Sequence, residues 1–171
     1  MLKYTECQVG FSEVPEEIAL CINISGCPIH CKGCHSPHLW KDIGKELNPK
    51  VLSDLIARNP GITCIAFMGG DAEPKEVELL AKWVRKHTKL KVCWYSGRDT
   101  IVGLILNYDY FDYIKIGSYD ETKGSLDKPT TNQRFYRVRH VVENDLNFNM
   151  LENITFKFKN NEANYKSKSV N

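Results

Sequence analysis

Four short apolar segments, separated by segments with a helical pattern, place the strongest constraint on the fold of this chain. The apolar segments are typical of buried strands and span Ile18–Ser25, Ile62–Met68, Leu90–Tyr95 and Phe111–Ile116. Asn48 followed by Pro49 is typical of a helix start, and Pro74 opens a second segment whose apolar residues share one helical face. Strands that alternate with helices favour an α/β fold with a mostly parallel sheet.

The length of the chain, 171 residues, predicts a single domain with its own core. We assign residues 1–159 to this domain and expect the polar segment Asn160–Asn171 to be a flexible tail. Among the remaining segments, the patterns predict a short helix over Thr100–Leu106 and a long polar loop over Ser118–Thr131. They further predict a strand or helix edge over Asn132–Asn144 and one half-exposed strand over Glu152–Lys159.

Charge and hydropathy exclude two classes of partner. Lys and Arg number 23 against 21 Asp and Glu, and a net charge of +2 gives no electrostatic basis for binding nucleic acid. The apolar runs are about six residues long, whereas a membrane-spanning helix needs about 20. The first residues lack the basic and then apolar layout of a signal peptide. We therefore expect a cytoplasmic protein with no membrane partner.

Three of the seven cysteines lie close together in the sequence. Cys27, Cys31 and Cys34 have the spacing C-x3-C-x2-C, which in a cytosolic chain indicates metal binding or redox chemistry. Zinc would need a fourth ligand, such as His30, His35 or His38. An iron–sulfur cluster held by three thiolates would keep one iron without a protein ligand, as reaction chemistry requires.

The other four cysteines have a different setting. Cys21, Cys64 and Cys93 lie within predicted strands, where a free cysteine behaves as a small buried apolar residue. Cys7 is the one candidate for an extra thiol near a site.

Small and polar residues follow three of the predicted strands. They occur at Ser25–Cys27, at Met68–Asp71 and at Tyr95–Gly97. The carboxyl ends of parallel strands meet at one edge of a sheet, where open α/β folds bind their ligands. In the second of these turns, Gly69 and Gly70 would let the backbone approach a ligand closely, and Asp71 would suit an ammonium group.

The cysteine spacing on a loop after the first strand resembles the radical S-adenosylmethionine superfamily. The resemblance implies a [4Fe-4S] cluster on Cys27, Cys31 and Cys34, and S-adenosylmethionine bound to the open iron and cleaved to a 5′-deoxyadenosyl radical. It further implies contacts to this cofactor from Gly33, Cys34 and His35 at the adenosine, Gly69, Gly70 and Asp71 at the methionine, Ser96 at the ribose and Lys115 near the carboxylate.

Within that superfamily, the chain resembles the activating enzymes of anaerobic (class III) ribonucleotide reductases. The similarity rests on Gly33 before the third cysteine, on Trp40, on Gly124-Ser125 and on Asn132–Arg134. It implies a small incomplete (β/α) barrel that generates a glycyl radical on the reductase, with a reductant such as flavodoxin. Two alternatives stay open: a small radical enzyme of the 7-deazaguanine-forming type, and a zinc-binding interaction module.

Overall fold

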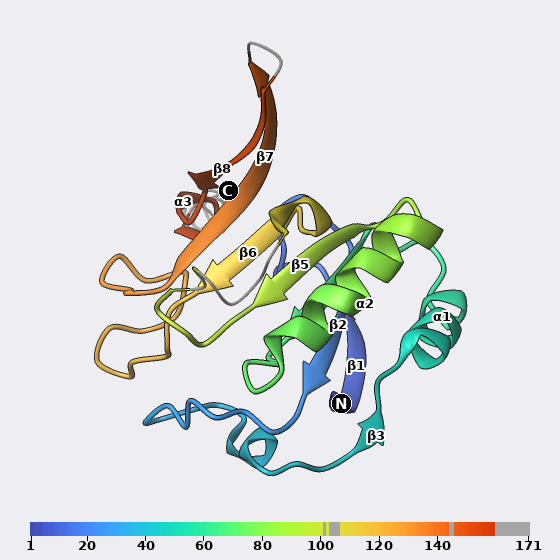
Figure 1. Cartoon of the computed structure of the whole chain (residues 1–171). Helices are drawn as coiled ribbons and strands as arrows, with labels where there is room; N and C mark the ends of the chain where they lie inside the picture. Colours follow the sequence, from blue (N-terminus) through green and yellow to red (C-terminus); the bar gives the residue numbers. More distant parts are fainter. Residues whose placement is uncertain (101, 103–106, 144–145, 160–171) are drawn as a thin grey trace, which may run out of the picture.

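A single sheet runs through the chain, whose computed structural model describes residues 1–100, 102, 107–143 and 146–159 (Figure 1). Its strands lie in the spatial order β3-β1-β2-β4-β5-β6-β7-β8. In chain order, these are β1 (Lys3–Gly10), β2 (Ala19–Ile24), β3 (Lys45–Glu46), β4 (Cys64–Met68), β5 (Lys91–Tyr95), β6 (Tyr113–Ile116), β7 (Arg134–Glu143) and β8 (Leu146–Asn153). The four strands predicted from the apolar segments are confirmed as β2, β4, β5 and β6.

The helical segments are η1 (Pro37–Trp40), α1 (Pro49–Arg58), α2 (Pro74–His87), η2 (Tyr108–Tyr110) and α3 (Phe156–Lys159). Two of the helical segments, α1 and α2, begin where the sequence places helix starts. The Asn48 side chain caps α1 by accepting a hydrogen bond from the Val51 backbone N–H at 3.0 Å. The last turn of α2 carries three basic residues, which suit the negative end of the helix dipole. None of the described helices is long and apolar enough to cross a bilayer.

The sheet is mixed, which corrects the expectation of a mostly parallel one. The three pairings that join β2, β4, β5 and β6 are parallel, because α1, α2 and the segment before β6 return the chain between them. The four pairings of the outer strands β1, β3, β7 and β8 are antiparallel. The α/β class and the single domain hold, with a parallel centre between antiparallel flanks.

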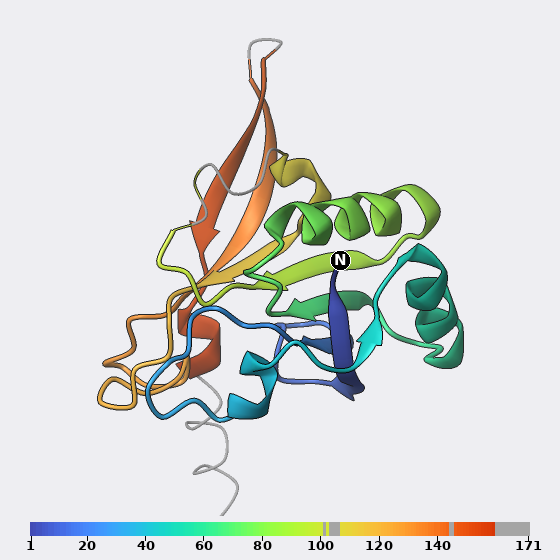
Figure 2. The ribbon, with the colours of Figure 1, turned by 60° about the horizontal axis from the view of Figure 1, so that its bottom comes forward.

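The two faces of the sheet are covered differently. On one face, α1 and α2 pack through residues such as Leu52 and Val77 against Ile22 and Ile65. Loops and α3 cover the other face, over a smaller core in which Phe135 of β7 contacts Phe158 of α3 at 5.0 Å between ring centroids (Figure 2). The loop-covered face is therefore the one with room for a ligand.

The C-terminal third departs from the sequence-based prediction. The expected strand over Glu152–Lys159 is wrong, because β8 ends at Asn153. The Asn153 side chain accepts from both the N–H and the hydroxyl of Thr155, at 3.0 and 2.7 Å, and this turn redirects the chain into α3. The undecided segment Asn132–Asn144 contains β7.

Two further predictions lie outside the described residues. They are the tail Asn160–Asn171 and most of the expected helix Thr100–Leu106.

Candidate functional site

The three clustered cysteines lie on one tight loop between β2 and η1. Backbone hydrogen bonds anchor its start, from the Gly26 N–H to Lys41 at 3.0 Å and from the Cys27 N–H to Leu39 at 2.9 Å. Gly33 has φ +72°, a left-handed conformation in which glycine is unstrained. We call the segment 27–34 the Cys loop.

All three thiols of the Cys loop are free and half-buried, and each meets backbone N–H groups. Cys31 Sγ accepts a hydrogen bond from the Tyr119 N–H at 3.3 Å, and Cys34 Sγ accepts one from the Ser36 N–H at 3.4 Å. Burial raises the pKa of Cys27, and the backbone N–H groups of the two residues before Cys31 oppose that rise. Such N–H donors stabilise negative charge on sulfur, as a thiolate ligand requires.

The polar segment after β6 packs directly on the Cys loop (Figure 2). The ring of Tyr119 lies 4.8 Å from that of His35, and Lys32 forms an ion pair with Glu121 at 3.0 Å. A Cβ on Gly33 would come within 2.7 Å of the Glu121 carboxylate, so glycine allows this close approach. These contacts join residues almost 90 positions apart, and the sequence carries no local signal for them.

The Gly-Gly-Asp turn and Ser96 form a network between the ends of β4 and β5. Asp71 and Ser96 are each 1% exposed. The Asp71 carboxylate accepts from the Ser96 hydroxyl at 2.5 Å and from the Gly97 N–H at 2.9 Å, and the Asp71 carbonyl accepts from Arg98 at 2.8 Å. The structure thus brings two predicted cofactor residues together, with their polar atoms bonded to each other.

The fold itself explains why glycine occupies both of these positions in the turn. Gly69 and Gly70 have φ of +105° and +90°. A Cβ on Gly70 would come within 2.5 Å of Val77 in α2, so this glycine permits close helix packing. The Gly69 carbonyl accepts from the Trp94 indole N–H at 2.8 Å.

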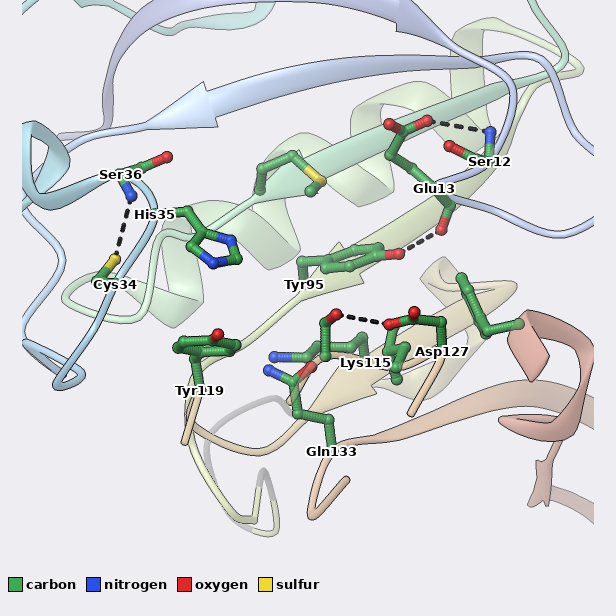
Figure 3. A pocket seen from close by; sticks show the side chains of 14 residues that line it. Ser12, Glu13, Cys34, His35, Ser36, Tyr95, Lys115, Tyr119, Asp127 and Gln133 are labelled. Atoms are coloured by element: carbon green, nitrogen blue, oxygen red, sulfur yellow. Dashed lines mark hydrogen bonds between the residues drawn. The ribbon is translucent and has the colours of Figure 1, made fainter. Parts of the chain in front are cut away.

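A cavity of about 990 Å³ lies on the loop-covered face, at the carboxyl ends of the parallel strands (Figure 3). Cys34 of the Cys loop and His35, which directly follows the loop, line this cavity. The lining does not include the turn Gly69–Asp71 or Ser96. It does include eleven residues that were not predicted to contact the cofactor: Ser12, Glu13, Ser36, Met68, Tyr95, Tyr119, Ser125, Leu126, Asp127, Gln133 and Phe158.

Lys115 also lines the cavity, from the end of β6. It is 7% exposed, and its ammonium group donates to the carbonyls of Gly117 at 2.6 Å and Ser96 at 3.3 Å. Burial lowers its pKa from 10.5 to about 8. The nearby charges of Asp71, Asp99 and the thiols of the Cys loop act in the opposite direction and raise the pKa. The cavity wall therefore carries a cation suited to an anionic ligand group.

This lowered pKa predicts a specific dependence of stability on pH. Between pH 8 and 10.5 the unfolded chain keeps a proton on Lys115 that the folded chain has lost, so this residue makes the free energy of unfolding rise with pH. In urea unfolding, Lys115→Met should have a higher free energy of unfolding than wild type at pH 7. This advantage of the variant should fall by up to about 3 kcal/mol towards pH 10.5. The exposed control Lys89→Met should show a constant difference. A constant difference for Lys115→Met would contradict the burial of its charge.

Cys7 does not reach this cavity. It pairs in register with Ile22 and packs against the core under α1 and α2, on the opposite face of the sheet. Cys21, Cys64 and Cys93 are buried in strands, as predicted, and burial raises the pKa of each thiol.

The Cys loop fits an iron–sulfur cluster by its donor set. Cys27, Cys31 and Cys34 would hold the cluster. A site for a single metal ion is not formed among the described residues, because no three side chains of His, Cys, Asp or Glu are gathered closely enough there. Beside the loop, the Trp40 ring stacks on His30 at 4.8 Å, and its indole N–H is buried without a partner among the described residues. A buried donor without an acceptor is costly, and a sulfur-rich group beside the loop would supply acceptors.

Comparison with known proteins identifies the family. The model of a family described as a 4Fe-4S single cluster domain matches residues 17–127, which is more than half of the chain and includes the Cys loop, the Gly69–Asp71 turn and Lys115. No curated protein and no solved structure matches the chain. The half-buried thiols and the family match agree, and the chain belongs to the family of 4Fe-4S single cluster domains.

Proposed function

We propose that this protein is a radical S-adenosylmethionine activating enzyme, which generates a glycyl radical on an anaerobic ribonucleotide reductase. The observation that carries the proposal is the position of the Cys loop, with three thiols and no fourth, at the rim of a large cavity. When bound, the reduced cluster and S-adenosylmethionine supply a 5′-deoxyadenosyl radical, with an electron from a donor such as flavodoxin. The parallel centre of the sheet is consistent with a small incomplete barrel of the radical enzymes.

The residues around the cavity have distinct roles in this proposal. Cys34 and His35 line the wall beside the cluster, and the neighbouring ring of Tyr119 gives an apolar surface for an adenine. Lys115 offers a buried positive charge to the carboxylate of the methionine moiety. Met68 and Tyr95 form the floor at the strand ends and help to exclude water from a reactive species.

The test is an anaerobic assay of cofactor cleavage. The protein is reconstituted with iron and sulfide, reduced, and mixed with S-adenosylmethionine, and 5′-deoxyadenosine is quantified. We expect 5′-deoxyadenosine from wild type and a glycyl radical signal in electron paramagnetic resonance when a class III reductase is added. A full, reducible cluster that yields neither product, with or without the reductase, would contradict the proposal.

A second candidate is a small radical enzyme that acts on a small molecule, such as the 7-deazaguanine-forming type. The polar lining of the cavity favours it, since Glu13, Ser125, Asp127 and Gln133 line the cavity from three segments. The same assay separates the two candidates. A small-molecule enzyme would cleave S-adenosylmethionine without leaving a radical on the added reductase.

A further inference from the structure

The three thiols of the Cys loop differ in where their hydrogen-bond donors come from. Two of them receive local N–H groups, Cys34 from Ser36 and Cys27 from its own loop. Cys31 Sγ instead accepts from the N–H of Tyr119 at 3.3 Å, across 88 positions of sequence. Among the described residues, the donor at Cys31 is therefore the one that depends on tertiary structure.

This donor belongs to the segment 117–121 after β6, which we call the strap. Two backbone groups of the strap are anchored away from the Cys loop. The Gly117 N–H donates to the Arg98 carbonyl at 2.7 Å, and the Ser118 carbonyl accepts from the Asn132 side chain at 2.9 Å. These bonds tie the strap to the segments that follow β5 and precede β7, so the frame of the sheet fixes its position.

The side chains of the strap also contact the Cys loop and its neighbour, but at the surface. Glu121 pairs with Lys32 at 3.0 Å, yet the Lys32 side chain is 91% exposed, and exposed ion pairs contribute little to stability. The Tyr119 ring lies 4.8 Å from that of the exposed His35 (Figure 3). The backbone anchors, more than the ion pair, therefore hold the Tyr119 N–H at the sulfur.

We propose that the strap raises the reduction potential of the cluster by holding the Tyr119 N–H on Cys31 Sγ. One-electron reduction, by dithionite in the test below, adds negative charge to a bound cluster and its thiolate ligands, and no covalent bond forms or breaks. An N–H donor stabilises that added charge, and hydrogen bonds to the sulfurs are among the features that set cluster potentials. The proposal rests on the 4Fe-4S cluster of the family and is independent of radical chemistry.

A redox titration of the reconstituted protein, without S-adenosylmethionine, tests the proposal. Tyr119→Pro removes the N–H, and Tyr119→Ala is its matched control, because it removes the same ring and keeps the N–H. The midpoint potential is followed by the electron paramagnetic resonance signal of the reduced cluster. Tyr119→Pro should lose about tenfold in the equilibrium constant for reduction, a shift of about 59 mV to more negative potential. Tyr119→Ala should stay close to wild type.

Two further variants leave Tyr119 and the Cys loop unchanged. Asn132→Ala frees the Ser118 carbonyl from its anchor, so it should shift the potential in the same direction as Tyr119→Pro, by a smaller amount. Glu121→Gln breaks the exposed ion pair and keeps both backbone anchors. Since it also removes a negative charge beside the loop, its potential should not become more negative.

The iron and sulfide content and circular dichroism verify that each variant carries a full cluster and is folded. Equal potentials for Tyr119→Pro and Tyr119→Ala would overturn the proposal. If Tyr119→Pro assembles no cluster, Asn132→Ala decides, and a wild-type potential for that variant would overturn the proposal as well. Because no S-adenosylmethionine is present, these results are independent of the cofactor-cleavage assay.

Discussion

Replacing Cys31 by alanine is expected to abolish cluster assembly while the chain remains folded. The residue lies on a loop outside both cores, so its loss leaves the sheet and helices intact. A cluster with three protein ligands that loses one of them is held by only two thiolates. Iron and acid-labile sulfide, measured after anaerobic reconstitution, should fall from about four of each per chain to near zero. Cleavage of S-adenosylmethionine should disappear with them.

Cys7→Ala is the matched control for this experiment. Cys7 is also free and half-buried, but it lies on the opposite face of the sheet. The control should keep its brown colour, its iron and its activity. A brown, active Cys31→Ala protein would show that the ligands have been assigned incorrectly, and an effect of Cys7→Ala equal to that of Cys31→Ala would do the same.

The sequence was sufficient to predict the strands at the centre of the sheet and insufficient to predict those at its flanks. β2, β4, β5 and β6 are largely buried on both faces, so their sequences are mostly apolar and predict strands directly. β1 is an outer strand with half-buried and exposed residues, and it carries no such run. Around the end of β8, apolar alternation predicted a strand over Glu152–Lys159, but the side chain of Asn153 forms a local turn that overrides the pattern.

The candidate site, like the fold, could be predicted from the sequence only in part. The spacing of Cys27, Cys31 and Cys34 predicts the cluster loop, because local spacing is itself the signal for a metal site. Tyr119 reaches Cys31 across 88 positions of sequence, and Gln133 enters the cavity from the start of β7. Only tertiary structure brings such residues together, so pattern analysis of one sequence could not identify them as part of the cavity.

Asp71→Ala is expected to lower the free energy of unfolding by about 3 kcal/mol in the protein without any cofactor. The carboxylate is buried and accepts from the Ser96 hydroxyl and the Gly97 N–H, so its removal leaves one buried and one half-buried donor without an acceptor. Each such donor costs about 1–3 kcal/mol. The Arg98 guanidinium, whose Nε lies 4.0 Å from the carboxylate, loses its counter-charge as well. Urea unfolding of the cluster-free chain measures the change.

Two further variants distinguish this structural role from the ligand role predicted for Asp71 by family resemblance. Asp71→Asn keeps one acceptor oxygen and should cost only about 1 kcal/mol. Ser96→Ala removes the hydroxyl partner, so its effect and that of Asp71→Ala should fall short of additivity by about 1 kcal/mol in a double-mutant cycle. If Asp71 instead serves to bind the ammonium of methionine, Asp71→Asn should remain as stable as wild type and lose affinity for S-adenosylmethionine. Because the carboxylate oxygens already accept bonds from Ser96 and Gly97, we expect stability to be affected more than affinity.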